Sequence, residues 1–357
     1  MVTLFDSISL GDLTLSNRVF MAPLTRNRAR SDGVPGTLAA TYYAQRASAG
    51  LIVSEATQIS PMGKGYKDTP GIYTEEQVSA WSRVVESIHM AGGKIFLQLW
   101  HVGRISHSSL LPDGAQPVAP SAIRARSQTF TDAGFVDVSE PRALTLSEIK
   151  QTINDYGVAA ANAKRAGFDG VEIHAANGYL IDQFLQSTTN QRLDLYGGNA
   201  ENRTRFLCEV AEAVLSVWDA ARVGVRLSPF GTFNDMEDAK PEETYLRVVA
   251  DLNLLGLGYL HIIEPSSMPN SAAGAPELLF QQLRRNWNAV YIVNGGYDSA
   301  RAESAVSSGY ADAVSFGKLF IANPNLPARL RQNLPLNTPD PTTFYGGGER
   351  GYIDYPV

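Results

Sequence analysis

Short runs of apolar residues alternate with longer segments of helical periodicity along the whole chain. Eight runs are predicted to be strands, because each is mostly apolar and four or five residues long. They are 19–22, 51–54, 95–99, 170–174, 223–227, 259–262, 290–293 and 313–316. The helical segments between and after them are 36–48, 75–90, 146–166, 201–220, 241–255, 276–285, 299–307 and 324–332.

This alternation predicts an α/β fold with a parallel sheet. Eight strand–helix pairs are the number that closes into a (β/α)8 TIM barrel. An open, doubly wound sheet would show a similar alternation, so the pattern alone leaves closure open. The length of 357 residues suits one barrel, since such barrels run from about 200 to over 400 residues. We therefore expect residues 1–357 to form a single barrel domain.

Two segments interrupt the alternation. Residues 5–16 alternate apolar and polar positions around Gly11-Asp12, as in a hairpin, and we expect residues 1–18 to cap the amino-terminal end of the barrel. After the third strand, residues 101–141 form a long connection rich in Ser, Pro, Ala and Arg, with short β-like pieces. An insertion of this length is typical of a lid or a pocket wall.

Composition and charge narrow the class of partner. The formal charge of −6 and the pI near 5.5 give no general attraction to nucleic acid or to anionic membranes. No apolar run reaches the ~18 residues that a membrane span needs. The first residues also lack the basic and apolar regions of a secretory signal. We expect a protein of the reducing cytoplasm.

Cys208 is the only cysteine in the chain. A single cysteine excludes an intrachain disulfide, a cysteine-based zinc site and an iron–sulfur cluster held by four cysteines of one chain. Its apolar helical surroundings predict a packed thiol rather than a nucleophile. No metal site is expected, although a metal-dependent lyase or isomerase on the same barrel stays an alternative. That class would need clustered carboxylates at strand ends, where Glu55 and Glu264 are the obvious candidates.

The fourth strand ends in the densest chemical motif of the chain, His174-Ala175-Ala176-Asn177-Gly178-Tyr179. If the strand turns at once into a helix, His174 and Asn177 lie three apart on one face and can direct two donors at one oxygen. Such donors stabilise negative charge on a carbonyl or nitro group. Tyr179 is a weak acid that can protonate a carbanion-like centre. The alternative is a turn histidine that only satisfies backbone groups.

Residues at the other strand ends face the same pocket of a barrel. Glycines after strands seven and eight, Gly295-Gly296 and Gly317 before Lys318, match the usual phosphate site of this architecture. The remaining strand ends supply a lining for a flat, electron-accepting heterocycle from Thr25, Ala56, Gln98 and Arg226. Gln98 can face a pyrimidine-like edge, and Arg226 can stabilise negative charge at N1/C2=O of a reduced flavin. Taken singly, Arg226 could form a barrel ion pair, Gln98 a core amide and Thr25 a turn.

Five separated stretches, in order, make the chain resemble the old yellow enzyme family, in the bacterial branch with N-ethylmaleimide reductase and pentaerythritol tetranitrate reductase. The likeness extends over nearly the whole chain. It rests on 17–26 (NRVFMAPLTR), 98–104 (QLWHVGR), 174–180 (HAANGYL), 191–198 (QRLDLYGG) and 313–324, which ends FIANP.

The resemblance implies an FMN-containing barrel and assigns roles to residues at matching positions. His174 and Asn177 would bind the substrate oxygen, and Tyr179 would donate the proton. Tyr66, Trp100 and Tyr345 would shape the substrate cavity. The implied FMN contacts are Pro23, Thr25, Ala56, Gln98, Arg226, Gly295, Gly296, Gly317 and Lys318. Lys318 stands where the family usually has arginine, and an ammonium cannot make the same bidentate phosphate contact.

The implied activity is the reduction of activated C=C bonds in α,β-unsaturated aldehydes, ketones, maleimides and nitroalkenes. NADPH or NADH would reduce the flavin and leave, and the alkene would then bind in its place and take hydride from N5. Reduction of nitro compounds or nitrate esters as the main activity is one alternative. A non-catalytic flavin-binding barrel is another, although it would not need the three-residue cluster. We expect small-molecule partners only, and a monomer or homodimer.

Overall fold

Eight parallel strands close into a barrel in the computed structural model, which describes residues 2–265 and 275–357. The ring closes because the fourth strand pairs with the third on one side and the fifth on the other. The strands are β3 (Val19–Met21), β4 (Ile52–Val53) continued by β5 (Thr57–Gln58), β6 (Ile95–Trp100), β11 (Gly170–Ala175), β12 (Val223–Leu227), β13 (Tyr259–Ile263), β14 (Val290–Asn294) and β15 (Ala313–Phe316). The predicted (β/α)8 barrel is confirmed, and the open doubly wound sheet is excluded.

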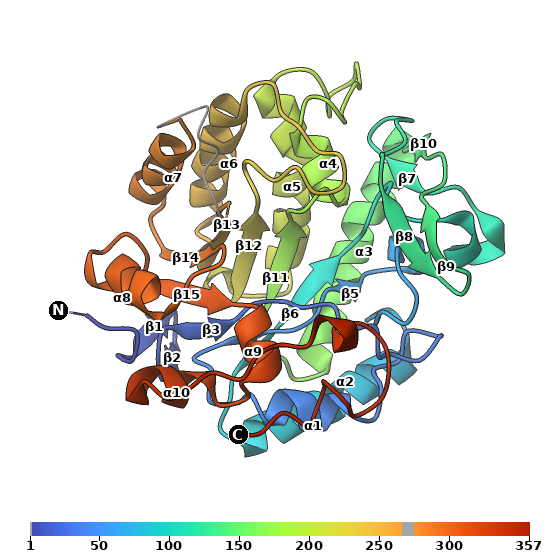
Figure 1. Cartoon of the computed structure of the whole chain (residues 1–357). Helices are drawn as coiled ribbons and strands as arrows, with labels where there is room; N and C mark the ends of the chain where they lie inside the picture. Colours follow the sequence, from blue (N-terminus) through green and yellow to red (C-terminus); the bar gives the residue numbers. More distant parts are fainter. Residues whose placement is uncertain (1, 266–274) are drawn as a thin grey trace.

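Helices surround the barrel and bury its outer face (Figure 1). They are α1 (Ala39–Ala44), α2 (Glu75–Met90), α3 (Leu146–Arg165), α4 (Leu180–Leu185), α5 (Ala200–Leu215), α6 (Pro241–Leu255), α7 (Ala275–Asn286), α8 (Ser299–Ser307), α9 (Lys318–Ala322) and α10 (Leu326–Gln332). The predicted bounds of α2, α6 and α8 are correct. The short helices α4 and α9 were not predicted, because five or six residues are too few to show helical periodicity.

Two predicted helices extend several residues beyond the observed ones. Residues 36–48 were expected to be helical, but the α-helix there is only α1. The backbone continues in tighter turns, in which the N–H of Arg46 donates to the carbonyl of Tyr43 and that of Ala47 to Ala44. The expected helix 201–220 likewise ends at Leu215, and Val217 then donates three residues back to Val214. Tightening from four-residue to three-residue spacing is common where a helix ends.

The second strand is broken at 54–56, between β4 and β5. There the N–H of Glu55 donates to the hydroxyl of Tyr43 (2.8 Å) instead of to a neighbouring strand. Both halves still pair in parallel with β6. The break places Ala56 at the carboxyl end of the barrel with its side chain buried.

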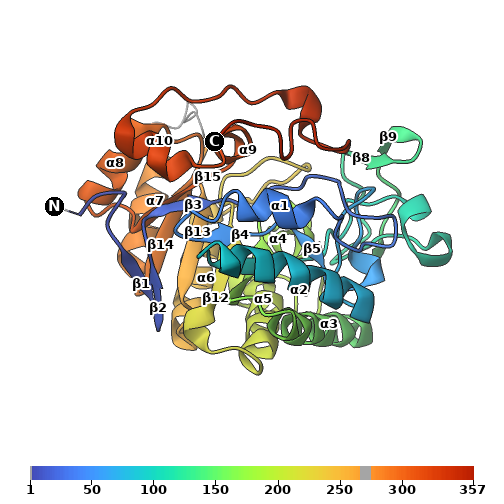
Figure 2. The same cartoon turned by 90° about the horizontal axis from the view of Figure 1, so that it is seen from below.

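The amino-terminal hairpin caps the barrel as expected. Strands β1 (Ile8–Leu10) and β2 (Leu13–Leu15) pair antiparallel around Gly11-Asp12 (Figure 2). Their apolar side chains pack on a cluster of residues from the barrel strands. That cluster consists of Phe20, Leu51, Val53, Phe96, Tyr259, Ile292 and Ala313. The hairpin thus fills this end of the barrel with apolar side chains.

The insertion after the third strand contains β structure, as expected. Strands β8 (Gln128–Thr131) and β9 (Gly134–Asp137) form an antiparallel hairpin. Strand β7 (Val118–Ala119) pairs in parallel with β10 (Arg142–Ala143), one residue beyond the predicted end of the insertion. Short 3-10 turns lie at Ser108–Leu110 and Pro112–Gly114. Figure 1 shows this unit beside β5 and β6, on one flank of the barrel.

The chain after α10 returns to the first strand–helix connection. Arg26, fully buried, donates to the carbonyls of Phe344 (2.9 Å) and Gly351 (2.8 Å). The N–H of Gly346 donates back to the carbonyl of Arg26 (2.9 Å). These bonds bring residue 345 near the carboxyl end of the barrel. Within the described ranges, no helix combines the length and the apolar character that crossing a membrane requires; the cytoplasmic location stays a prediction.

Candidate active site

Most of the predicted site residues lie at or just after the carboxyl ends of seven barrel strands, so they gather at one end of the barrel. Pro23 and Thr25 follow β3, Ala56 lies between β4 and β5, and Gln98 and Trp100 belong to β6. His174 and Arg226 are direct partners in the register of β11 and β12. The glycines follow β14 and β15. The barrel thus supplies the convergence that the sequence predicts.

His174 is a neutral hydrogen-bond donor at the end of β11. The residue is 3 % exposed, and its Nδ1 accepts a bond from the N–H of Ala176 (3.3 Å). Burial, with the nearby charges of Arg226 and His261, holds the pKa of His174 well below its usual value. In a neutral ring with an accepting Nδ1, the proton lies on Nε2. His174 can therefore donate from Nε2 to a ligand oxygen.

Asn177 is positioned by a left-handed turn and not by a helix. Its φ is 58°, Gly178 follows at 75°, and α4 begins only at Leu180. The helical start that would place positions 174 and 177 on one face is therefore wrong. The backbone of Asn177 is held on both sides, since its N–H donates to Ser228 Oγ (2.8 Å) and its carbonyl accepts from Asn234 Nδ2 (2.9 Å).

Tyr179 lies in an aromatic cluster beside His174. Its ring meets those of Trp100 and His174 edge to face, each at 5.1 Å between centroids. The hydroxyl is 3.2 Å from that of Tyr66, whose ring stacks on Trp100. Burial, reinforced by Tyr66, raises the pKa of Tyr179 well above its usual value, so the phenol stays protonated at neutral pH. A protonated phenol beside a neutral imidazole donor is what the predicted chemistry needs.

Tyr345 lies on the carboxyl-terminal segment and is 62 % exposed. Burial is the largest cause of the raised pKa of Tyr66 and of Tyr179, and the phenol of Tyr345 is close enough to raise both pKa values further. It therefore borders the aromatic cluster from the solvent side. Its role in shaping a substrate cavity stays a prediction.

Asn234 lies beside the predicted site residues, although no motif in the sequence points to it. It follows β12, has a φ of 63° and is buried. Besides its bond to Asn177, its Oδ1 accepts from Ser127 Oγ of the insertion (2.9 Å). Its amide also lies near the hydroxyls of Tyr66 and Tyr179, where it favours their ionised forms. The available signal was the turn-prone Phe233-Asn234-Asp235 after a barrel strand.

Asn234→Ala should lower the free energy of unfolding by about 2 kcal/mol, because it removes two buried bonds and leaves alanine in a left-handed backbone. Urea unfolding followed by tryptophan fluorescence would measure this. Ser127→Ala is the matched control, which removes one of the two bonds and should cost about half as much. Equal free energies of unfolding for Asn234→Ala and wild type would show that the two hydrogen bonds of Asn234 do not stabilise the fold.

A buried polar network lies inside the barrel beneath these residues. Glu172, fully buried in β11, accepts from Gln98 Nε2 (2.7 Å), the Tyr259 hydroxyl (3.0 Å) and His261 Nδ1 (2.8 Å). His261 Nε2 is 2.7 Å from Ser315 Oγ. Burial disfavours ionisation of Glu172, yet His261, Arg226 and Gln98 lower the pKa of its carboxyl. A lone carboxylate in an apolar strand was the only sequence signal for this network.

Glu172 orients Gln98, one of the side chains that are predicted to face a flavin. It engages the amide nitrogen of Gln98, which fixes the orientation of that side chain. Arg226 is 6 % exposed and donates from Nη2 to Asn294 Oδ1 (3.0 Å). Its Nε is buried, and within residues 2–265 and 275–357 it has no hydrogen-bond partner. An unsatisfied guanidinium nitrogen at a strand end is an observation that fits a bound electron-rich ligand.

The glycines after β14 and β15 are accessible and adopt special backbone geometry. Gly295 has a φ of 146° and Gly296 of 69°, which L residues with a β-carbon rarely adopt. Gly317 precedes the first turn of α9, and Lys318 opens that helix with an exposed side chain. Together with Arg226, Gln98 and Thr25, this set fits a flavin with its phosphate at the two glycine turns. These assignments stay predictions.

The alternative metal site finds no counterpart in the part of the chain that the structure describes. No group of three or more His, Cys, Asp or Glu side chains there could hold a metal ion. Glu55 lies within hydrogen-bond distance of the hydroxyl of Tyr43 (3.4 Å), and burial raises its pKa to about 7. Glu264 belongs to a separate cluster after β13 with Tyr297 and Arg301. Cys208 lies in α5, where burial raises the pKa of its thiol to about 12.

The chain is similar to known flavin oxidoreductases over almost its whole length. The sequence profile of the NADH:flavin oxidoreductase / NADH oxidase family matches residues 3–337. The 12-oxophytodienoate reductase 1 of Oryza sativa subsp. japonica is 45% identical over 360 residues, which cover 99% of this chain and 93% of that protein. The 12-oxophytodienoate reductase 2 of Arabidopsis thaliana is 40% identical over 361 residues, with 99% and 96% covered.

Solved structures show the same fold at high identity. Morphinone reductase in complex with tetrahydroNAD superposes with a TM-score of 0.94 and is 49% identical, covering 100% of this chain and 98% of that one. The old yellow enzyme homologue from Zymomonas mobilis superposes with a TM-score of 0.96 and is 44% identical, with 100% of both chains covered.

Proposed function

Because the chain belongs to the NADH:flavin oxidoreductase / NADH oxidase family, and within it to the old yellow enzymes, we propose that it reduces activated C=C bonds. The enzyme class is that of FMN-dependent oxidoreductases that use a nicotinamide as hydride donor. The proposed substrates are α,β-unsaturated aldehydes, ketones, maleimides and nitroalkenes. Two relatives support this class by name, since 12-oxophytodienoate and morphinone both denote ketones.

The observation that carries the proposal is the pairing of a neutral His174 with a protonated Tyr179, 5.1 Å apart between ring centroids. Bound FMN would supply the hydride at N5. A substrate oxygen would accept from Nε2 of His174 and from the side-chain amide of Asn177, which draws electron density away from the alkene. Tyr179 would then give its phenolic proton to the α-carbon.

The surrounding residues position these groups. The indole of Trp100 and the phenol of Tyr66 pack on Tyr179 and limit its motion. Asn234 and Ser228 hold the backbone of Asn177, so that its amide needs little further ordering when a ligand binds. On the flavin side, Arg226 would stabilise negative charge at the N1/C2=O edge, and Gln98 would face the same ring.

The proposal is tested with the purified holoprotein under anaerobic conditions. NADPH or NADH should bleach the flavin absorbance, and cyclohexenone should then restore it. A panel of enones, maleimides, nitroalkenes and nitrate esters, run with both nicotinamides, ranks the substrate classes. Bleaching without reoxidation by any alkene would contradict the proposal and favour a flavin-binding barrel. Faster reoxidation by nitro compounds or nitrate esters than by alkenes would favour those as the main substrates.

A further inference from the structure

A compact polar cluster lies directly behind the Gly295–Gly296 turn. The turn packs on the backbone of Glu264, because a β-carbon at position 295 would lie 2.3 Å from the carbonyl oxygen of Glu264. The N–H of Glu264 also donates to the carbonyl of Asn294 (2.7 Å) at the end of β14. Any movement of Glu264 would therefore displace the turn.

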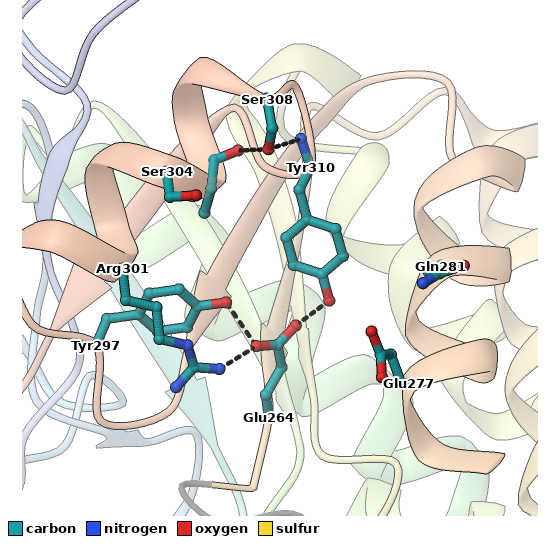
Figure 3. Close-up of a pocket in the computed structure, with 9 residues that line it drawn as sticks. Glu264, Glu277, Gln281, Tyr297, Arg301, Ser304, Ser308 and Tyr310 are labelled. Carbon is teal, nitrogen blue, oxygen red and sulfur yellow. Dashed lines mark hydrogen bonds and ion pairs between the residues drawn. The ribbon is translucent and has the colours of Figure 1, made fainter. Parts of the chain in front are cut away.

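The carboxylate of Glu264 is held by three side chains from different segments (Figure 3). It is 3 % exposed and accepts from the Tyr297 hydroxyl (2.6 Å), from Arg301 Nη2 (3.2 Å) and from the Tyr310 hydroxyl. Burial, reinforced by Glu264, raises the pKa of both phenols, so they remain protonated donors. These four residues are called the brace below.

Arg301 connects the brace to the turn itself. Its Nη1 donates to the carbonyl of Gly295 (3.2 Å), while its guanidinium lies 3.9 Å from the ring centroid of Tyr297. One planar side chain thus holds Glu264, Tyr297 and the carbonyl side of the turn together. Its position in the first turn of α8 fixes it to the barrel.

The cavity beside the brace does not itself have the features of a ligand site. It has a volume of about 350 Å³ and is also lined by Glu277 and Gln281 of α7. Both carboxylate oxygens of Glu264 already accept hydrogen bonds from the brace. The contacts of Arg301 and Glu264 with Gly295 indicate instead that the brace supports the turn.

We infer that the brace positions the Gly295–Gly296 turn so that its backbone N–H groups can bind the phosphate of the flavin. This rests on the function proposed above. None of the four residues would touch the cofactor, so they are positioning residues. The turn is more important for phosphate binding in this chain, because the Lys318 ammonium cannot make the bidentate contact of an arginine. Backbone donors fixed in advance then supply more of the phosphate affinity.

The test compares FMN with riboflavin, which lacks the phosphate. Full-length protein freed of flavin is titrated with each, and quenching of flavin fluorescence gives the dissociation constants. Arg301→Met, Tyr310→Phe and Glu264→Gln should each weaken FMN binding about tenfold, since the donors lose their fixed geometry. Riboflavin binding should stay within about twofold of wild type.

Two control variants accompany this measurement, one expected to lose FMN affinity and one expected to keep it. Lys318→Ala should weaken FMN and spare riboflavin, which shows that the assay detects phosphate contacts. Glu277→Gln changes a charge in the same cavity but makes no hydrogen bond to the brace among the described residues, and should change neither constant.

Unchanged FMN affinity in Arg301→Met and Tyr310→Phe would overturn the inference, as would an equal loss of FMN and riboflavin affinity, which indicates general damage. These two variants decide the question if Glu264→Gln does not fold. Wild-type protein that binds neither flavin would instead overturn the proposed function.

Discussion

Tyr179→Phe should slow the reduction of an enone by about 10²- to 10⁴-fold, the range expected when a positioned acid is removed. The phenol is the proposed proton donor, and its raised pKa keeps it protonated at neutral pH. Phenylalanine keeps the ring that packs on Trp100 and His174, so the neighbouring groups should stay in place. Reduction of the flavin by NADPH or NADH should remain near the wild-type rate.

Anaerobic stopped-flow measurements separate the two half-reactions. Tyr66→Phe is the matched control, because Tyr66 carries the other hydroxyl of the pair, 3.2 Å away. It should slow the enone step much less than Tyr179→Phe. Wild-type turnover by Tyr179→Phe would mean that another acid or water protonates the product. A larger loss in Tyr66→Phe would assign that acid to Tyr66.

His174→Ala should reduce the rate of the enone step by about 10²- to 10³-fold, as expected for the loss of one donor to a developing oxyanion. It should also weaken the binding of phenols and enones, while the nicotinamide still bleaches the flavin. Binding is measured by titration of the oxidised holoprotein, through changes in the flavin spectrum. Unchanged substrate affinity would remove His174 from the site.

His174→Gln distinguishes a donor role from a packing role, since the glutamine amide still offers an N–H. It should recover part of the lost affinity. The pH dependence gives a second check. Folded-state pKa values well below 6.5 for His174 and well above 10 for Tyr179 mean that neither group titrates between about pH 6 and 9. The enone step should therefore be nearly flat over this range, and an acid limb near pH 6.5 would contradict a neutral His174.

The barrel could be predicted from the sequence because each strand is buried on both faces. Apolar side chains therefore point both inward and outward along a strand, which leaves continuous apolar runs such as 19–22 that stand out in the sequence. If the sheet closes into a barrel, the carboxyl ends of all eight strands face one pocket. The positions of Gln98, His174 and Arg226 could thus be expected before any coordinates, although not their partners.

The hydrogen-bond partners of these side chains come from distant segments of the chain, so no local sequence pattern predicts them. Glu172 lies in the predicted strand β11, but its bonds to Tyr259 and His261 form only when β13 is brought close to it in the ring. Asn234 reaches Asn177 across 57 positions of sequence. The helical spacing assumed for positions 174 and 177 failed for a related reason, since the turn there is set by bonds to Ser228 and Asn234 rather than by local propensity.

The left-handed backbone at Asn177 limits which substitutions can be interpreted. Most side chains are strained at a φ of 58°, whereas glycine, asparagine, aspartate and histidine tolerate it. In a randomised library at position 177, most variants would lose activity through a distorted chain before any question of ligand contact arises. Substitutions at position 177 would therefore report on ligand contact mainly when they introduce glycine, aspartate or histidine. Substrate preference would evolve more easily through positions such as Tyr66 or Tyr345, where the backbone is not left-handed.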